Sequence, residues 1–147
     1  MYSLINTVEF EMVIGTVKGY EPGKEQNELD VLPINEVIDI YDKIATKTYE
    51  ETGIYVSVVI QPCVTVYKQD WGCPKGGEPC YKISAVMNRI FNDDYKRFSE
   101  AVYANFLELK KELGQVSVTI VERQVGAEYI NSKFKKEEER EEAIYFV

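Results

Sequence analysis

The stretch that most constrains this fold is residues 54–91, because apolar side chains alternate along both of its halves. In residues 54–67 the more apolar side chains occupy even positions, and in residues 81–91 they occupy mainly odd positions. A period of two is typical of a half-buried strand, so the two halves predict the strands of a long β-hairpin. Its tip, residues 70–80, reads DWGCPKGGEPC, in which proline and glycine favour a turn.

The switch from even to odd positions restricts how the two strands pair. Facing residues of an antiparallel pair have a constant sum of residue numbers, and this sum must be odd if both apolar faces are to lie on one side of the sheet. Placing Cys73 opposite Cys80 satisfies that condition and sets Val66 opposite Met87. We therefore expect Cys73 and Cys80 to face each other near the tip.

The rest of the chain supplies two more strands and two helices. Alternation predicts a strand over residues 7–18, and apolar side chains at helical spacing predict a helix over residues 33–53. A second stripe at helical spacing predicts a helix over residues 93–113, and residues 116–121 alternate again as a last strand. The predicted order along the chain is β-α-β-β-α-β.

This order resembles the ferredoxin-like superfold. The resemblance covers residues 7–125 and implies an α+β fold: a four-stranded antiparallel sheet with two helices on one face, the second strand at an edge, and here an extended second hairpin. We expect one such domain over residues 1–125, followed by a charged helical tail with an apolar C-terminus over residues 126–147. The superfold hosts many unrelated functions, so the resemblance predicts no activity.

The sheet face that the helices leave uncovered is expected to be apolar. Eight side chains point to it by alternation: Val13, Val17, Tyr55, Val59, Tyr67, Val86, Ile90 and Val121. Large exposed apolar surfaces mark interaction sites, so something should cover this face. The expected cover is a second copy of the chain, which gives a homo-oligomer and most simply a dimer, or the chain's own tail. The tail could instead dock on an unidentified protein partner.

Composition argues against several classes of function. The chain has 17 basic and 25 acidic residues, a net charge of −8, which is unfavourable for nucleic-acid binding because Lys and Arg bind phosphates. No uncharged apolar run is long enough to cross a bilayer, so we expect no membrane partner. The first residues carry no secretory signal, and together with an odd number of cysteines this predicts a cytoplasmic protein.

The chain contains no histidine. This removes Ser-His-Asp and Cys-His schemes, histidine metal sites and the usual near-neutral general base. Three cysteines without histidine fit a structural zinc site poorly, and no cofactor or metal is expected. An enzyme built from this chain would need carboxylates, Lys, Tyr or Cys with shifted pKa values.

The hairpin tip and the uncovered face are the places to look for a site. The candidate contact residues for a small molecule or partner are Trp71, Cys73, Glu78, Cys80, Tyr55 and Tyr67. The favoured hypothesis is a non-catalytic, homo-oligomeric binding or assembly domain. One alternative is a cysteine-based redox switch or enzyme, in which Cys73 and Cys80 form a reversible disulfide and Glu78 accepts a proton. Another is an acidic decoy from a mobile genetic element that binds a basic protein.

Overall fold

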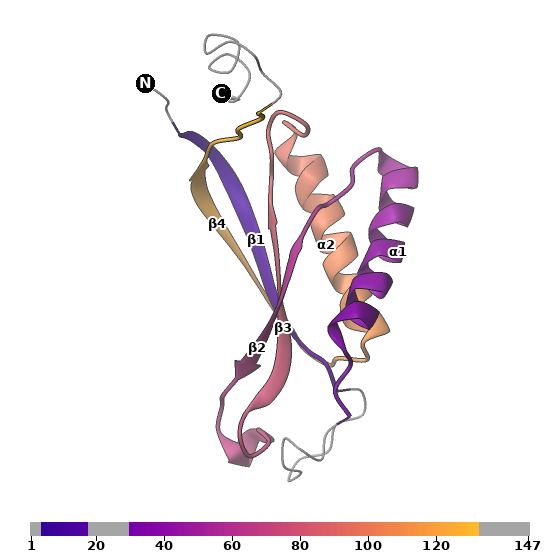
Figure 1. The fold of residues 1–147 in the computed structure, drawn as a ribbon, viewed down its shortest axis with the longest axis vertical. Coiled ribbons are helices and arrows are strands. Elements are labelled where there is room, and N and C mark those ends of the chain that lie inside the picture. The colour runs from indigo at the N-terminus through magenta and orange to yellow at the C-terminus, as the bar shows by residue number, and fades with distance from the viewer. Residues whose placement is uncertain (1–3, 18–29, 133–147) are drawn as a thin grey trace.

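The computed structural model describes residues 4–17 and 30–132. Its elements, in order, are β1 (Ile5–Gly15), α1 (Ile34–Thr52), β2 (Val59–Thr65), the short 3₁₀ helix η2 (Gln69–Trp71), β3 (Glu78–Val86), α2 (Tyr95–Glu112) and β4 (Thr119–Ala127). The strands form an antiparallel sheet in the order β2-β3-β1-β4, and both helices lie on one face of it (Figure 1). The predicted α+β class is confirmed, with β2 at an edge. Residues 133–147 of the expected tail lie outside the described residues.

The core between the sheet and the helices follows the predicted periods. On β1 the alternate side chains Phe10, Met12 and Ile14 are fully buried, as alternation requires. Fully burying such a side chain contributes about 1.5–3 kcal/mol, so these stripes are a main source of the fold's stability. Helix α1 ends at Gly53, whose φ of 78° lies in the left-handed region that glycine adopts without strain.

The pairing of β2 with β3 differs from the predicted register. Cys63, not Cys73, lies opposite Cys80. Cys73 lies in the connecting loop, where its Sγ is 3.5 Å from the amide nitrogen of Tyr67. The predicted Cys73–Cys80 pairing is therefore wrong, although Ile60 does face Ile83 in the core, as the parity argument requires. Alternation fixes which side a residue faces but not where the strand ends, and β2 ends before the alternating pattern does.

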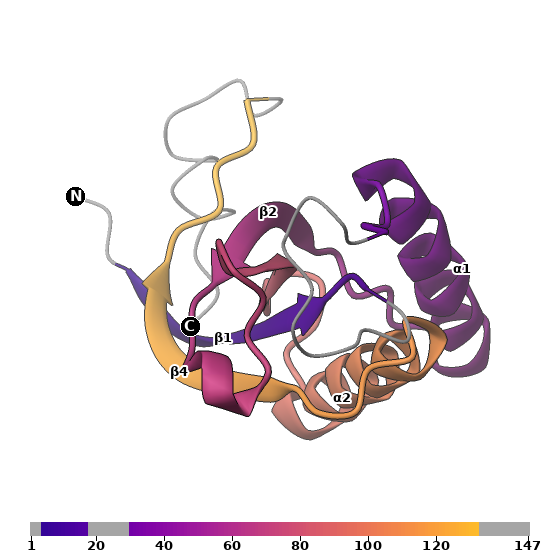
Figure 2. The ribbon, with the colours of Figure 1, turned by 90° about the horizontal axis from the view of Figure 1, so that it is seen from below.

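Residues 66–77 form a loop that turns away from the β2–β3 ladder. It contains η2, followed by Gly72, Gly76 and Gly77 with φ angles of 104°, 94° and 93°. Side chains avoid this region of backbone conformation, so glycine is needed at these turns. At Gly77 a Cβ atom would also lie 2.3 Å from Val64 Cγ1. Seen from below, this loop lies in front of the sheet (Figure 2), and Trp71 of η2 lines the same pocket as Thr119 at the start of β4.

The uncovered face of the sheet is more polar than predicted. Arg123 of β4 lies between two acids of β1, with its Nη1 2.5 Å from Glu9 Oε1 and its Nη2 3.5 Å from Glu11 Oε2. Lys82 of β3 adds a third contact, 3.9 Å from Nζ to Glu11 Oε1. The exposed valines that surround these ion pairs are Val59, Val86 and Val121. Val17, which was expected on this face, is buried.

None of the described helices is long and apolar enough to cross a membrane.

Candidate functional site

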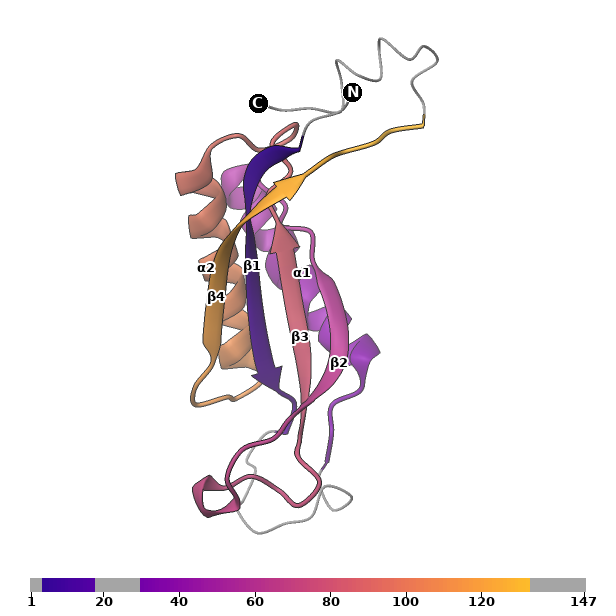
Figure 3. The same ribbon diagram turned by 90° about the vertical axis from the view of Figure 1, so that its left-hand side faces the viewer.

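A pocket of about 650 Å³ is lined by residues of the loop 66–77 and of the connection between α2 and β4. Both segments lie at the same end of the sheet (Figure 3). The pocket is lined by the end of β1, the start of β3, residues 114–119 and the side chains of Tyr67 and Trp71. Among the described residues that line it, Glu78 is the only one with a charged side chain. The described lining therefore contains one acidic side chain and no basic one.

Two neutral donors hold the Glu78 carboxylate. The hydroxyl of Tyr67 donates to Oε1 at 2.9 Å, and the thiol of Cys80 donates to Oε2 at 3.3 Å. Glu78 and Cys80 are two residues apart on β3, so strand alternation points both side chains to the same face. Because neither donor is a cation, the contacts orient the carboxylate without neutralising its charge.

Gly15 makes room for this carboxylate on the neighbouring strand. It faces Cys80 across the β1–β3 pair, and a Cβ atom there would lie 3.0 Å from Glu78 Oε2 and 2.5 Å from Gln115 Oε1. Gln115 is anchored in turn, since its Nε2 donates to the carbonyl oxygens of Val17 and Leu113, both at 3.1 Å. The sequence does not reveal Gly15 or Gln115 as site residues, because they meet Glu78 only through the tertiary fold.

Two aromatic side chains form the outer wall of the pocket. Trp71, the only tryptophan in the chain, is 75% exposed at the end of η2. Tyr67 lies closer to the sheet and is partly buried. Flat aromatic rings beside a carboxylate suit a ligand that has both a flat ring and a positive charge.

The thiols in and near the pocket are poor nucleophiles. Burial raises the pKa of Cys80 to about 12, with a smaller lowering effect from its hydrogen bond with Thr65 and a raising effect from Glu78. Burial also raises the pKa of Cys63. All three cysteines are free thiols. Since the thiolate is the reactive form, this setting disfavours cysteine chemistry.

The structure brings together four of the six candidate residues from the sequence. The four on the pocket lining are Tyr67, Trp71, Glu78 and Cys80. Cys73 is buried in the loop instead, and its thiol donates to the carbonyl oxygen of Pro74 at 3.5 Å. Tyr55 lies away from the pocket, beside α1, where its hydroxyl donates to Asp42 at 2.8 Å.

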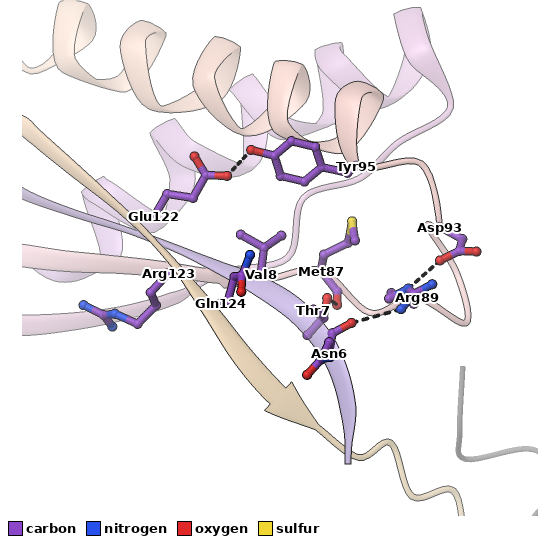
Figure 4. Close-up of a pocket in the computed structure, with 10 residues that line it drawn as sticks. All are labelled: Asn6, Thr7, Val8, Met87, Arg89, Asp93, Tyr95, Glu122, Arg123 and Gln124. Carbon is purple, nitrogen blue, oxygen red and sulfur yellow. Dashed lines mark hydrogen bonds and ion pairs between the residues drawn. The ribbon is translucent and has the colours of Figure 1, made fainter. Parts of the chain in front are cut away.

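A second cavity of about 750 Å³ lies at the opposite end of the sheet (Figure 4). Three of its four charged side chains, Arg89, Asp93 and Arg123, form ion pairs. Arg89 Nε is 2.6 Å from Asp93 Oδ1, and Arg89 Nη1 donates to the carbonyl oxygen of Asn6 at 3.0 Å. The hydroxyl of Tyr95 donates to Glu122. This cavity has two basic and two acidic residues in its lining, so it offers no net charge to a ligand.

Within the described part of the chain, no group of three or more Cys, Asp or Glu side chains is placed to hold a metal ion. The described features of the pocket that can contact a ligand are therefore the Glu78 carboxylate with its hydrogen bonds and the aromatic side chains of Tyr67 and Trp71.

An α+β domain with such a pocket is typical of proteins that bind a small molecule. A family model described as SAM lyase matches residues 5–131, which is most of the chain. The chain therefore belongs to the SAM lyase family.

Solved structures of phage SAM lyases resemble the fold. One, in complex with S-methyl-5′-thioadenosine, is 18% identical with a TM-score of 0.52, and the match covers 86% of this chain and 95% of that chain. Another, in the apo state, is 17% identical with a TM-score of 0.49 and covers 89% and 98%. At such low identity, the first likeness supports the fold alone. Comparison with curated proteins gives no match.

Membership of this family overturns the function favoured from the sequence. The non-catalytic binding or assembly domain is wrong, because the family is one of lyases. The alternatives, a cysteine-based redox switch or enzyme at Cys73 and Cys80 and an acidic decoy, are overturned as well, because the matched family is described as SAM lyase and Cys73 does not lie opposite Cys80. The superfold resemblance named no specific family, whereas the chain belongs to one. The error lies in the weight given to the missing histidine. Its absence removes schemes built on histidine, but carboxylates and other side chains remain available to a lyase reaction.

Proposed function

We propose that this chain cleaves S-adenosylmethionine and releases S-methyl-5′-thioadenosine, in the pocket around Glu78. Family membership over residues 5–131 supports the reaction, and the compound bound to the phage SAM lyase supports the product. The observation that supports this pocket as the site is the Glu78 carboxylate, held by Tyr67 and Cys80 with no basic side chain in the described lining.

The chemistry of the substrate explains why a chain without histidine suffices. The sulfur of S-adenosylmethionine is a positively charged sulfonium. When its bond to the amino-acid chain breaks, both electrons of the bond stay on sulfur, which leaves as a neutral thioether and needs no proton. The carbon that loses sulfur becomes neutral in one of two ways: the neighbouring carbon gives up a proton to a base, or the substrate's own carboxylate oxygen bonds to it. Neither route adds water.

The pocket supplies what both routes need from the protein. An ionised Glu78 attracts the sulfonium, and at 4 Å two opposite charges near a protein surface gain about 4 kcal/mol. Trp71 and Tyr67 would flank the flat adenine ring. In the proton-loss route Glu78 is also the base, whereas in the internal route it holds the sulfonium while the substrate folds on itself. Holding the reacting atoms in one geometry is itself a large part of such catalysis.

The test is to incubate the purified full chain with S-adenosylmethionine and to separate the products by liquid chromatography with mass detection. We expect S-methyl-5′-thioadenosine to form in proportion to the protein concentration, with no oxygen-18 taken up from labelled water at neutral pH. The two routes give isomers of equal mass, an unsaturated amino acid and a lactone, so proton NMR of the four-carbon product identifies the route. Formation of the thioether no faster than in buffer alone would overturn the proposal.

We also propose that the chain self-associates through the uncovered sheet face, most simply as a dimer. The exposed valines around the Arg123 ion pairs support this, because complementary charges within an apolar surround suit a self-complementary interface. Native mass spectrometry should give a mass of two or more copies, and Arg123→Glu should dissociate it by placing a third acid beside Glu9 and Glu11. A monomer mass at micromolar concentration would contradict this proposal.

The cytoplasm is the location that we propose for the enzyme. Three free thiols in the structure support this, since disulfides are rare in the cytoplasm. Fractionation of cells that express the full chain would test it, and recovery outside the cytoplasmic fraction would contradict it.

A further inference from the structure

A chain of three hydrogen-bonding groups runs under the pocket, and the proposed reaction gives it no role so far. The hydroxyl of Thr65 donates to Cys80 Sγ at 3.3 Å, and the Cys80 thiol donates to Glu78 Oε2 at 3.3 Å. The other oxygen, Oε1, accepts from Tyr67. Cys80 is only 4% exposed, so it contributes little surface to the pocket that it helps to line.

We propose that Cys80 is a positioning residue, whose buried thiol holds the Glu78 carboxylate toward the pocket as a neutral hydrogen-bond donor fixed by Thr65. This inference rests on the proposed cleavage of S-adenosylmethionine, because it assigns the thiol a task in that site. Cys80 neither attacks the substrate nor exchanges electrons.

The environment of Cys80 keeps its proton in place. Burial is the main reason that its pKa rises to about 12, and the adjacent carboxylate adds to the rise. At neutral pH the group is therefore a thiol and has a hydrogen to donate. An S–H donor is weaker than an ammonium or guanidinium and brings no positive charge, so it orients Glu78 without competing with a cationic substrate.

The strand pairing explains why the thiol can reach only one side of the carboxylate. Thr65 lies opposite Glu78 on β2, while Cys63 lies opposite Cys80. On the other side of β3, Gly15 faces Cys80, and the missing side chain there leaves the space that Glu78 occupies. The Glu78 carboxylate thus lies next to Gly15 of β1, and its Oε2 accepts the hydrogen bond from Cys80.

Few titratable groups surround this carboxylate. Among the described residues on the pocket lining they are Tyr67 and Cys80, and Cys63 adds one more from β2 on the far side of the thiol. Loss of the thiol donor should therefore change the protonation of the carboxylate directly. A donor to a carboxylate favours its charged form, so its removal makes the acid harder to ionise.

The matched variants are Cys80→Ala, Cys80→Ser and Cys63→Ala. The first removes the donor and the second replaces it with a hydroxyl. The third removes the thiol of Cys63, which lies opposite Cys80 on β2 and is not among the described donors to Glu78. We expect Cys80→Ala to lower kcat/KM about 10-fold, Cys80→Ser to recover most of that loss, and Cys63→Ala to stay within about 2-fold of wild type. In Cys80→Ala the acid limb of the pH profile of kcat/KM should move to higher pH.

A readout without activity separates this proposal from the proposed reaction. The S–H stretching band of Cys80, identified by its loss in Cys80→Ala, should lie below that of an unbonded thiol and should shift up in Glu78→Gln. If wild type makes no S-methyl-5′-thioadenosine but the band shifts, the reaction fails and the contact stands. An unchanged band and an unchanged pH profile would overturn the proposal. Equal losses in Cys80→Ser and Cys80→Ala, with the pH profile unmoved, would also overturn it, since they would indicate packing alone.

Discussion

The two ends of the sheet carry cavities of similar size, but they arrange their charges in opposite ways. At the far end, Arg89 is paired with Asp93, and Glu122 accepts a hydrogen bond from Tyr95 in a lining that also holds a second arginine. At the loop end, the donors to Glu78 among the described residues are the neutral hydroxyl of Tyr67 and thiol of Cys80. A lining with equal numbers of acidic and basic residues offers a cation no net attraction, whereas a described lining whose one charged residue is an acid does.

This difference in charge matters because the family match alone does not indicate which of the two cavities binds the substrate. Residues 5–131 include the lining of both cavities. S-adenosylmethionine carries positive charges on its sulfonium and its ammonium group and a negative charge on its carboxylate. A net positive ligand is attracted to a lining with net negative charge, and among the described residues this supports the proposed pocket around Glu78.

The largest expected effect comes from removing the charge at each end in turn. Glu78→Gln keeps the size of the side chain but loses the attraction to the sulfonium, so we expect kcat/KM to fall about 100-fold or more. Glu122→Gln, the matched change at the other end, should stay within about 2-fold, as for a surface substitution. Formation of S-methyl-5′-thioadenosine measures both. A large loss in Glu122→Gln with an active Glu78→Gln would move the site to the far end.

The next effect concerns the exposed aromatic residue at each end. Trp71→Ala should raise KM about 10-fold with little change in kcat or in stability, because stacking of a base on an aromatic ring contributes about 1–3 kcal/mol. Phe91→Ala is the control: its ring packs on Tyr129 at 5.6 Å between centroids, away from the pocket. Steady-state kinetics give KM, and the fluorescence of Trp71, the only tryptophan, should change when S-methyl-5′-thioadenosine is added. Equal KM values for the two variants, or a silent tryptophan, would count against the aromatic wall.

The elements with a strong period could be predicted from the sequence. The alternation along β1 and the helical stripe of α2 reflect burial on one face, which is a local property of the chain. The β2–β3 register could not be predicted in the same way. Any odd sum of residue numbers satisfies the pattern, and the choice among these sums depends on the loop 66–77, whose course is set by η2 and three glycines with positive φ.

The candidate site was predictable in part for the same reason. Trp71, Glu78 and Cys80 are conspicuous in the sequence because they lie in a short block rich in proline and glycine. Gly15 and Gln115 are not, since a glycine at a strand end and a glutamine after a helix are ordinary in sequence and matter only through their contacts with each other and with Glu78. The reaction was missed because no residue pattern for sulfonium chemistry stands out beside the missing histidine.

The smallest expected effect compares one glycine at each end of the sheet. In Gly15→Ala the new Cβ would lie 2.5 Å from Gln115 Oε1 and 3.0 Å from Glu78 Oε2, both at the far ends of flexible side chains. These atoms can move at little cost to folding, so the fold should survive while the carboxylate shifts. We expect kcat/KM to fall about 5-fold, since small misplacements of reacting groups slow catalysis, with a Tm change of no more than about 3 °C.

Gly126→Ala is the matched change at the far end, where the Cβ would meet Leu4 Cβ at 3.0 Å and Cδ1 at 3.1 Å. Leu4 is exposed and can give way, so both activity and Tm should stay close to wild type. Kinetics and thermal unfolding of the two variants, measured side by side, distinguish a misplaced carboxylate from a loss of stability. If both lose activity equally, or if Gly15→Ala loses none, the close packing of Glu78 over β1 is not what places the carboxylate, and Tyr67 and Cys80 alone must hold it.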